Sequence, residues 1–154
     1  MSSEPVVSPL RDEFKKALVE SAKARDQVRL DTIRAVQSAV RYKEIEKKGT
    51  LTDPEILSVI NTLCKQRRES IEQFKNGGRT ELAEKEAREL SILEKFLPAQ
   101  LSKEDVEKAV AQVIKDLGAS GASAMGNVMK ETMKRLAGQA DGKLVNEIVR
   151  SQLK

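Results

Sequence analysis

The fold is decided by residues 52–97, which read TDPEILSVINTLCKQRRESIEQFKNGGRTELAEKEARELSILEKFL. Thr52 followed three residues later by Glu55 is the sequence signature of a capping box at the start of a helix. The helix is expected to continue to Asn76, where Gly77 and Gly78 end it. Its apolar residues recur three and four positions apart, as in a helix packed within a bundle: Ile56, Ile60, Leu63, Ile71 and Phe74.

A second helix is expected to begin near Thr80 and to run to Leu97, before Pro98. Arg67 and Glu86 interrupt the apolar stripes of the two helices, and an antiparallel hairpin places them at nearly the same height. We therefore predict an ion pair between them. Glu89 is the only nearby acid that would supply a second carboxylate for acid–base chemistry, and the ion pair is the preferred interpretation.

The same patterns extend in both directions and predict an all-α protein without strands. After an irregular lead over residues 1–8, the Ser8 and Pro9 pair starts a helix. We expect an N-terminal bundle of about four helices over residues 1–97 and a small C-terminal tail of three helices over 98–154. The remaining helices are expected from Pro9 to about Ala24, from Asp26 to Lys48, from Ser102 to Leu117, and over 124–137 and 142–152.

Composition excludes several kinds of chemistry. The chain has no histidine, which removes the commonest general base, the usual zinc ligand and the Ser-His-Asp and Cys-His nucleophile systems. Its one cysteine, Cys64, lies among apolar residues and is interpreted as a packed thiol. One tyrosine, three phenylalanines and no tryptophan leave little aromatic surface for stacking bases. We expect no catalytic residues, no metal and no cofactor.

The net charge is +4, a mild bias that permits an anionic partner without requiring one. The first fourteen residues, MSSEPVVSPLRDEF, lack the apolar core of a signal peptide and contain acids that transit peptides avoid. No apolar run reaches the length of a membrane span. A cytoplasmic location without membrane association is the expectation.

The last thirty residues, 125–154, carry the clearest candidate binding surface, reading MGNVMKETMKRLAGQADGKLVNEIVRSQLK. From Gly118 onward there are six basic and three acidic residues. Gly138, Asp141 and Gly142 predict a tight corner between two helices, with Asp141 as the N-cap. The candidate nucleic-acid contacts are Lys130, Lys134, Arg135, Lys143 and Arg150. On the residues alone, a solvated basic face is the preferred interpretation.

The corner sequence GQADGKL, residues 138–144, has the Gly-Lys pair of a phosphate-binding loop but not the rest of the motif. Its spacer is one residue short, Leu144 replaces the hydroxyl residue, and a helix rather than a strand precedes it. Nucleotide hydrolysis is therefore rejected. Amides at the start of the last helix, with Lys143 beside them, still offer a place for a backbone phosphate.

From Leu10 to Leu153 the chain resembles the YqeY family. The matching segments are ALVESAKARDQVRLDTIRAVQSAV, KQRRESIEQFKNGGRTELAEKEARELSILEKFLPAQLS, MGNVMK and ADGKLVNEIV. The C-terminal part of that family is similar to the tail domain of the B subunit of aspartyl/glutamyl-tRNA amidotransferase. Gln139 stands where the family pattern is expected to carry a basic residue, which removes an expected phosphate contact.

The resemblance implies an all-helical protein whose tail is associated with tRNA. The amidotransferase holds its ATP-using site in a separate domain, for which this chain has no counterpart. A label of carbon-nitrogen ligase activity with glutamine as amide donor would thus be inherited from the relative. Three functions stay open: a non-catalytic tRNA-associated or adaptor protein, an accessory of amidotransferase activity in a complex, and a protein-interaction module. The implied partners are tRNA and amidotransferase or other translation-related proteins.

Overall fold

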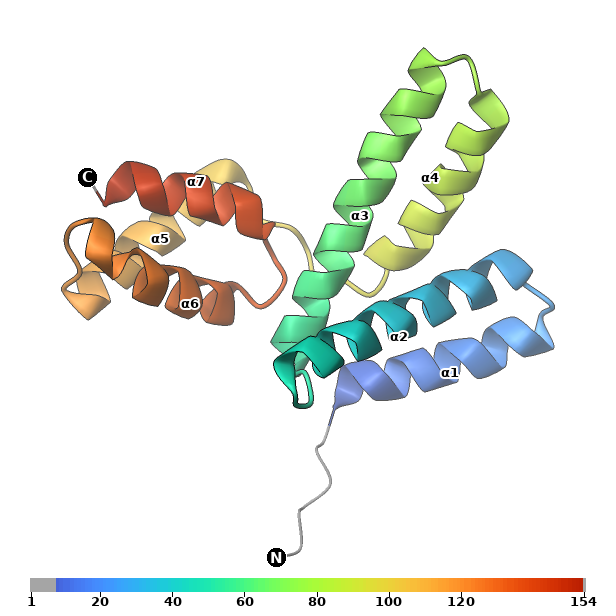
Figure 1. Cartoon of the computed structure of the whole chain (residues 1–154), viewed down its shortest axis with the longest axis horizontal. Helices are drawn as coiled ribbons and strands as arrows, with labels where there is room; N and C mark the ends of the chain where they lie inside the picture. The colour runs from blue at the N-terminus through green and yellow to red at the C-terminus, as the bar shows by residue number, and fades with distance from the viewer. Residues whose placement is uncertain (1–7, 154) are drawn as a thin grey trace, which may run out of the picture. The chain divides into compact units, whose positions relative to one another are not determined.

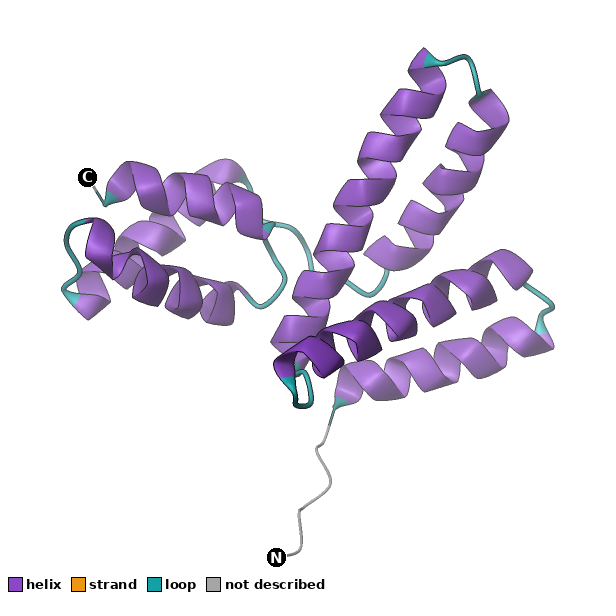
Figure 2. Cartoon of the chain, in the orientation of Figure 1, coloured by secondary structure: helices purple, strands orange, loops and turns teal. Residues whose placement is uncertain are grey.

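The computed structural model describes residues 8–153, which contain seven α-helices and no strand (Figures 1 and 2). The all-α prediction is confirmed, while the expected irregular lead lies, apart from Ser8, outside the described residues. A short 3₁₀ turn over Ala122–Ala124 precedes the sixth helix. The helices are α1 (Pro9–Lys23), α2 (Gln27–Lys47), α3 (Asp53–Asn76), α4 (Thr80–Glu94), α5 (Lys103–Leu117), α6 (Met125–Leu136) and α7 (Gly142–Gln152).

The helix starts follow from the capping residues in the sequence. The side chains of Ser8, Asp26 and Ser102 each accept a hydrogen bond from the backbone N–H three residues on. Thr52 and Glu55 form the complete capping box at the start of α3. These bonds satisfy N–H groups that have no partner within the helix, and they fix where each helix begins.

The chain divides into two compact units between Phe96 and Leu97. The first unit holds α1 to α4 and the second α5 to α7. The expected boundary lay one residue later. That each unit folds as an independent domain stays a prediction.

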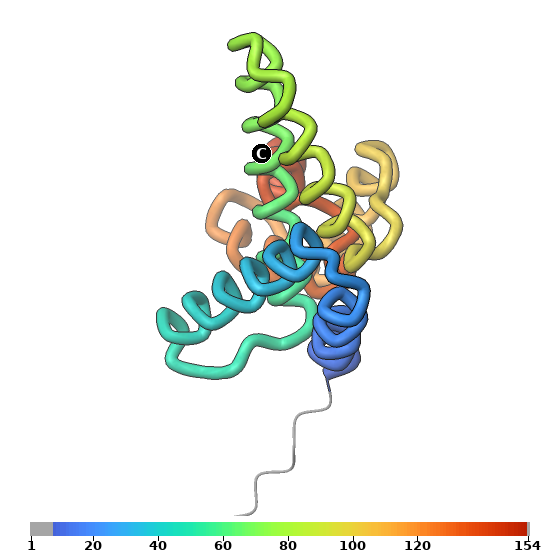
Figure 3. Tube along the Cα trace, turned by 90° about the vertical axis from the view of Figure 1, so that its right-hand side faces the viewer, coloured from blue at the N-terminus to red at the C-terminus, as the bar shows by residue number. Residues whose placement is uncertain are grey.

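The four helices of the first unit form two antiparallel hairpins, α1 with α2 and α3 with α4 (Figures 1 and 3). Ile33 and Val36 of α2 and Ile56 and Ile60 of α3 are fully buried between the hairpins, as is Leu93 to within 1%. Beyond Cys64, α3 has no fully buried residue, so the outer half of the α3–α4 hairpin is held mainly by its own two helices.

A polar junction fixes the first hairpin to the start of α3. One carboxylate oxygen of Glu44, near the end of α2, accepts hydrogen bonds from Arg11 at 3.0 Å and from the backbone N–H of Leu51 at 2.9 Å. Asp53, the first residue of α3, accepts hydrogen bonds from the Ser8 hydroxyl and from the backbone N–H of Leu10. Both carboxylates therefore bridge α1 to the region where α3 begins.

α4 ends at Glu94, three residues earlier than expected. The ring of Phe96 turns back onto α1 and packs edge-to-face against Phe14, with ring centroids 5.0 Å apart. Leu97 precedes a proline, and the proline ring disfavours helical backbone at that position. The aromatic contact and Pro98 together explain the early end.

The outer half of the α3–α4 hairpin contains a cluster of one cation and two anions. The guanidinium Nε of Arg67 lies 3.3 Å from a carboxylate oxygen of Glu86 and 2.9 Å from one of Glu89. The structure thus brings Arg67 and Glu86 together and adds Glu89 as a second partner. Arg67 Nε and that Glu86 oxygen make no hydrogen bond, so their contact is electrostatic. Two carboxylates therefore face one guanidinium, and the cluster carries one more negative than positive charge.

Replacing Arg67 with Met should lower the free energy of unfolding in urea by about 1–3 kcal/mol, because it leaves two half-buried carboxylates facing each other. Glu86→Gln should cost less, since Glu89 still pairs with Arg67. The neighbouring Arg68→Met variant is the matched control, because the Arg68–Glu94 pair is about half exposed and is worth less than about 1 kcal/mol. Additive losses for Arg67 and Glu86 in a double-mutant cycle would contradict this account.

Candidate nucleic-acid interface

The second unit is a three-helix core whose outward faces carry the candidate contacts. Val128, Thr132 and Leu136 of α6 and Val145 and Val149 of α7 point inward and are buried. They pack with Val106, Val110 and Val113 of α5. This aliphatic core uses one side of each helix and leaves the other side to charged residues.

Four of the five candidate cations are exposed and have no ion pair among residues 8–153: Lys130, Lys134, Lys143 and Arg150. Met133 of α6 lies beside the start of α7, 3.8 Å from where a Cβ on Gly142 would stand. Because a helix turns about 100° per residue, Lys130 lies on the same side of α6 as Met133. Arg150 donates a hydrogen bond to the Asn146 side chain at 3.3 Å and keeps its charge unpaired.

Arg135 differs from the other candidates. Its guanidinium lies 2.7 Å from Asp116 of α5 and 3.0 Å from Glu131 one turn earlier on α6. These hydrogen bonds raise the pKa of Arg135, and the bond from Arg135 is the main cause of a lowered pKa at Asp116. A phosphate would have to displace two carboxylates from Arg135. Arg135 is therefore better described as an ion-pair link between α5 and α6.

The tight corner between α6 and α7 is made by Ala137 and Gly138, and not by Asp141 and Gly142. Ala137 and Gly138 both have positive φ, 43° and 84°, so the turn is made before Asp141. Asp141 occupies the N-cap position of α7, yet its side chain makes no capping hydrogen bond. Gly142 is not required by space, since an added Cβ would meet Met133 at an ordinary distance.

Backbone contacts hold the corner against the segment that precedes α5. The side-chain amide of Gln100 donates to the carbonyl of Gly138 at 2.9 Å, and the N–H of Leu101 donates to the carbonyl of Gln139 at 2.8 Å. Asp141 puts a negative charge at the start of α7, which disfavours a phosphate on the amides there. Lys143 is therefore the phosphate contact that this corner offers.

Metal binding and thiol reactivity are two further properties on which the described residues bear. No three His, Cys, Asp or Glu side chains within residues 8–153 lie close enough to hold a metal ion. Burial raises the pKa of the Cys64 thiol to about 11, which keeps it protonated at neutral pH. No described helix is long and apolar enough to cross a membrane.

The family described as Yqey-like protein matches residues 11–153, nearly the whole chain. The chain is a member of this family. A relative from Kluyveromyces lactis, named altered inheritance of mitochondria protein 41, mitochondrial, is 38% identical over 114 residues, which cover 72% of this chain. The chain spans 60% of the length of that relative. A Saccharomyces cerevisiae protein of the same name is 30% identical over 141 residues, covering 89% of this chain and 71% of the relative.

The names of these relatives contradict the expectation of a cytoplasmic location, because each of them is called mitochondrial. The expectation relied on acids within the first fourteen residues. Composition is an indirect guide to location, since a targeting segment is read by a receptor and forms no part of the folded units.

Tyr42 belongs to no motif that the sequence patterns singled out. It lies on α2 and is 65% exposed, and Ile45 one turn later is 69% exposed. A count by segment would have drawn attention to this region, because residues 8–49 hold eleven basic and seven acidic side chains. The chain's positive charge is thus greater in this segment than in the tail.

The ion pair between Arg135 and Asp116 can be tested by NMR titration of the Asp116 carboxyl group. Its pKa should lie below the ordinary aspartate value and rise toward that value in an Arg135→Gln variant. Since the folded-state pKa is the lower one, the stabilisation is present above the unfolded-state pKa and is lost as pH falls through the folded-state pKa. Lys134→Gln removes a neighbouring cation without an ion pair and is the control. An unchanged pKa of Asp116 in the Arg135 variant would show that this ion pair does not form in solution.

Proposed function

We propose that this member of the Yqey-like family is a non-catalytic, tRNA-associated protein whose second unit contacts the RNA backbone. The observation that carries the proposal is the set of four exposed cations on α6 and α7 without ion pairs in the described part of the chain. Phosphates are held by such side chains through salt-dependent electrostatics and without reading base sequence. The mitochondrial location in the relatives' names is carried over to this chain as part of the proposal.

The acidic residues of the tail make the binding weak. Glu147 lies on α7 between Lys143 and Arg150 in the sequence, and Asp141 begins the helix. Few phosphates can therefore be neutralised at once, and affinity should be modest at physiological salt. A weak, sequence-indifferent contact suits a protein that assists a larger assembly on tRNA. An amidotransferase complex or another translation-related assembly is the proposed setting, in keeping with the resemblance of the tail.

Replacing Lys130, Lys134 and Lys143 with Ala should weaken tRNA binding and reduce the slope of log affinity against log salt by roughly 0.7–0.9 for each lost contact. Fluorescence anisotropy with labelled tRNA at several salt concentrations measures both effects. The matched control replaces Lys103, Lys108 and Lys115 of α5, which are also exposed lysines of the same unit. The two variants lose the same charge. A difference in their tRNA affinity therefore shows that the position of the lysines matters.

Gln139→Arg provides the opposite change and should strengthen binding. Gln139 is half-buried, and its amide contacts the carbonyl of Ala99 only weakly, at 3.5 Å, so little is lost on replacement. Equal binding by the α6–α7 variant and the parent would remove the tail as an RNA surface. Equal weakening by the α5 control would show that net charge, and not this face, determines the binding.

A further inference from the structure

The first unit has a charged hollow between α1 and α2. It measures about 320 Å³ and is lined in part by Arg11, Lys15, Gln37, Arg41 and Glu44. Glu44 is occupied by Arg11 and by the backbone of Leu51, so its charge is already compensated. Lys15 and Arg41 have no ion pair among the described residues and are exposed. The hollow therefore offers two unpaired cations and one side-chain amide to an anion.

The cations continue along the same face of α2. Arg34 and Arg41 are seven residues apart, which is close to two helical turns, so they lie on one side of α2 about 10 Å apart along its axis. Arg34 has no ion pair within residues 8–153. Glu44, three residues after Arg41, is paired with Arg11, and Asp31, three residues before Arg34, accepts a hydrogen bond from the neutral side chain of Gln27.

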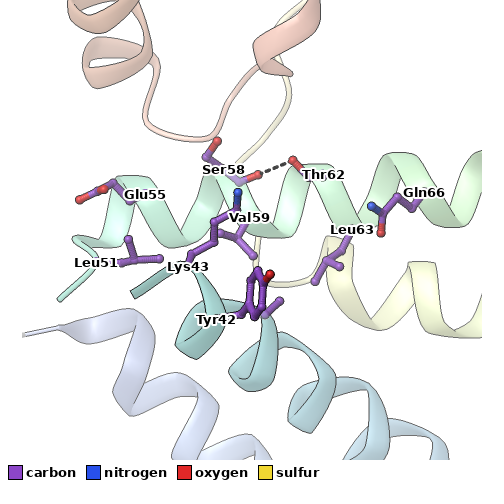
Figure 4. Close-up of a pocket in the computed structure, with 10 residues that line it drawn as sticks. Tyr42, Lys43, Leu51, Glu55, Ser58, Val59, Thr62, Leu63 and Gln66 are labelled. Atoms are coloured by element: carbon purple, nitrogen blue, oxygen red, sulfur yellow. Dashed lines mark hydrogen bonds between the residues drawn. The ribbon is translucent and has the colours of Figure 1, made fainter. Parts of the chain in front are cut away.

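On its other side, α2 borders an open groove of about 490 Å³ shared with α3 (Figure 4). Tyr42 stands at the α2 side, and Val59 and Leu63 come from α3. Ser58, Thr62 and Gln66 add hydroxyl and amide groups to the α3 wall. The groove thus combines an exposed aromatic ring, aliphatic walls and a few neutral polar groups, a mixture that is common in ligand sites.

The charged residues at the groove are compensated within the protein. Glu55 lies 2.6 Å from Lys47, and this hydrogen bond is the main cause of its lowered pKa. Lys43 contacts Glu46. A ligand in the groove therefore meets little net charge, whereas a ligand in the hollow between α1 and α2 meets unpaired cations. Only α2 separates the two sites, and Arg41 and Tyr42 are adjacent in the chain.

The cationic hollow and the aromatic groove on either side of α2 fit a single-stranded RNA segment better than a membrane. A helix that lies in a membrane surface inserts its apolar face, but the apolar face of α2, formed by Ile33, Val36 and Val40, is buried in the core of the unit. The exposed apolar side chains on α2 are Tyr42 and Ile45. Proteins that bind single strands combine a cationic track for the backbone with aromatic rings on which bases stack.

We infer that the exposed face of α2 binds an unpaired segment of RNA, with phosphates at Lys15, Arg34 and Arg41 and a base stacked on Tyr42 in the groove. The ligand class rests on the proposed function, while the site lies in the other unit and uses other residues. This site would stack a base, whereas the proposed contacts of the second unit are to phosphates alone. It also names the kind of RNA feature that the protein takes, which is a loop or an end whose bases are free.

Tyrosine fluorescence tests the stacking directly, because the chain has one tyrosine and no tryptophan. Titrating the full chain with a short oligouridine, with correction for RNA absorbance, should quench the emission of Tyr42 with the same saturation curve as anisotropy. An abasic phosphodiester polymer of equal length is the control ligand and should bind without comparable quenching. Binding of oligouridine without quenching would overturn the assignment of Tyr42.

Two variants separate stacking from charge. Tyr42→Leu should lower oligouridine affinity by about 5- to 150-fold, whereas Tyr42→Phe should retain it, because stacking on one aromatic ring contributes about 1–3 kcal/mol per base. Replacing Lys15, Arg34 and Arg41 with Gln should reduce the salt slope by about 2, at roughly 0.7 per single-strand contact. Replacing Lys75, Arg79 and Arg88 of the α3–α4 hairpin with Gln removes the same charge and is the control.

The outcomes distinguish this inference from the proposed function. If the α6–α7 variant loses tRNA binding while the α2 variants bind oligouridine like the parent, the inference is wrong and the tail proposal stands. If the α2 variants lose binding and the α6–α7 variant does not, the inference stands and the tail proposal fails. If Tyr42→Leu binds RNA normally, the groove is not a base site, and an apolar segment of a protein partner becomes its expected occupant.

Discussion

Glu44 and Asp53 determine how the helices of the first unit are arranged, and both proposed contacts of α2 depend on them. Glu44 joins Arg11 of α1 to the backbone of Leu51, and Arg11 itself donates to the Leu51 carbonyl at 3.1 Å. Asp53 joins the start of α3 to Ser8 and Leu10. Hydrogen bonds to a charged group stabilise by about 1.5–3 kcal/mol each, which is more than neutral ones contribute. The Glu44 bonds hold α2 against α1 and the residues before α3, and the Asp53 bonds hold α1 against the start of α3, so both sets support the helices that line the hollow and the groove.

Most of the fold could be predicted because its signals are local. Ser8, Thr52 and Ser102 are of residue types favoured at the N-cap before an apolar repeat, and each caps its helix here. The early end of α4 could not be predicted in the same way, since it depends on the contact of Phe96 with Phe14, more than eighty residues away in the chain. The way in which the two hairpins pack on each other also depends on contacts between distant residues, such as Asp53 with Ser8, and no periodicity specifies them.

The candidate site was less predictable than the fold. Spacing placed Lys130, Lys143 and Arg150 on outer helix faces, but it did not show that Arg135 is held by Asp116 from another helix. Asp141 has the residue type of an N-cap and makes no capping bond. Tyr42 was missed because tyrosine is intermediate in burial, so residue type alone does not show whether its ring is exposed, and its place at the groove becomes visible only when α2 and α3 are placed side by side.

RNA is expected to contact the face of α2 around Tyr42 in the first unit and the cationic side of α6 and α7 in the second. The most direct measurement is a set of amide chemical-shift changes in the full, isotope-labelled chain on addition of a short RNA hairpin with an unpaired loop. The account predicts changes centred on Arg41, Tyr42 and Thr62 in one unit and on Lys130 and Lys143 in the other, fading as salt is raised. Changes confined to the α3–α4 turn, or a spectrum that RNA leaves unaltered at low salt, would contradict it.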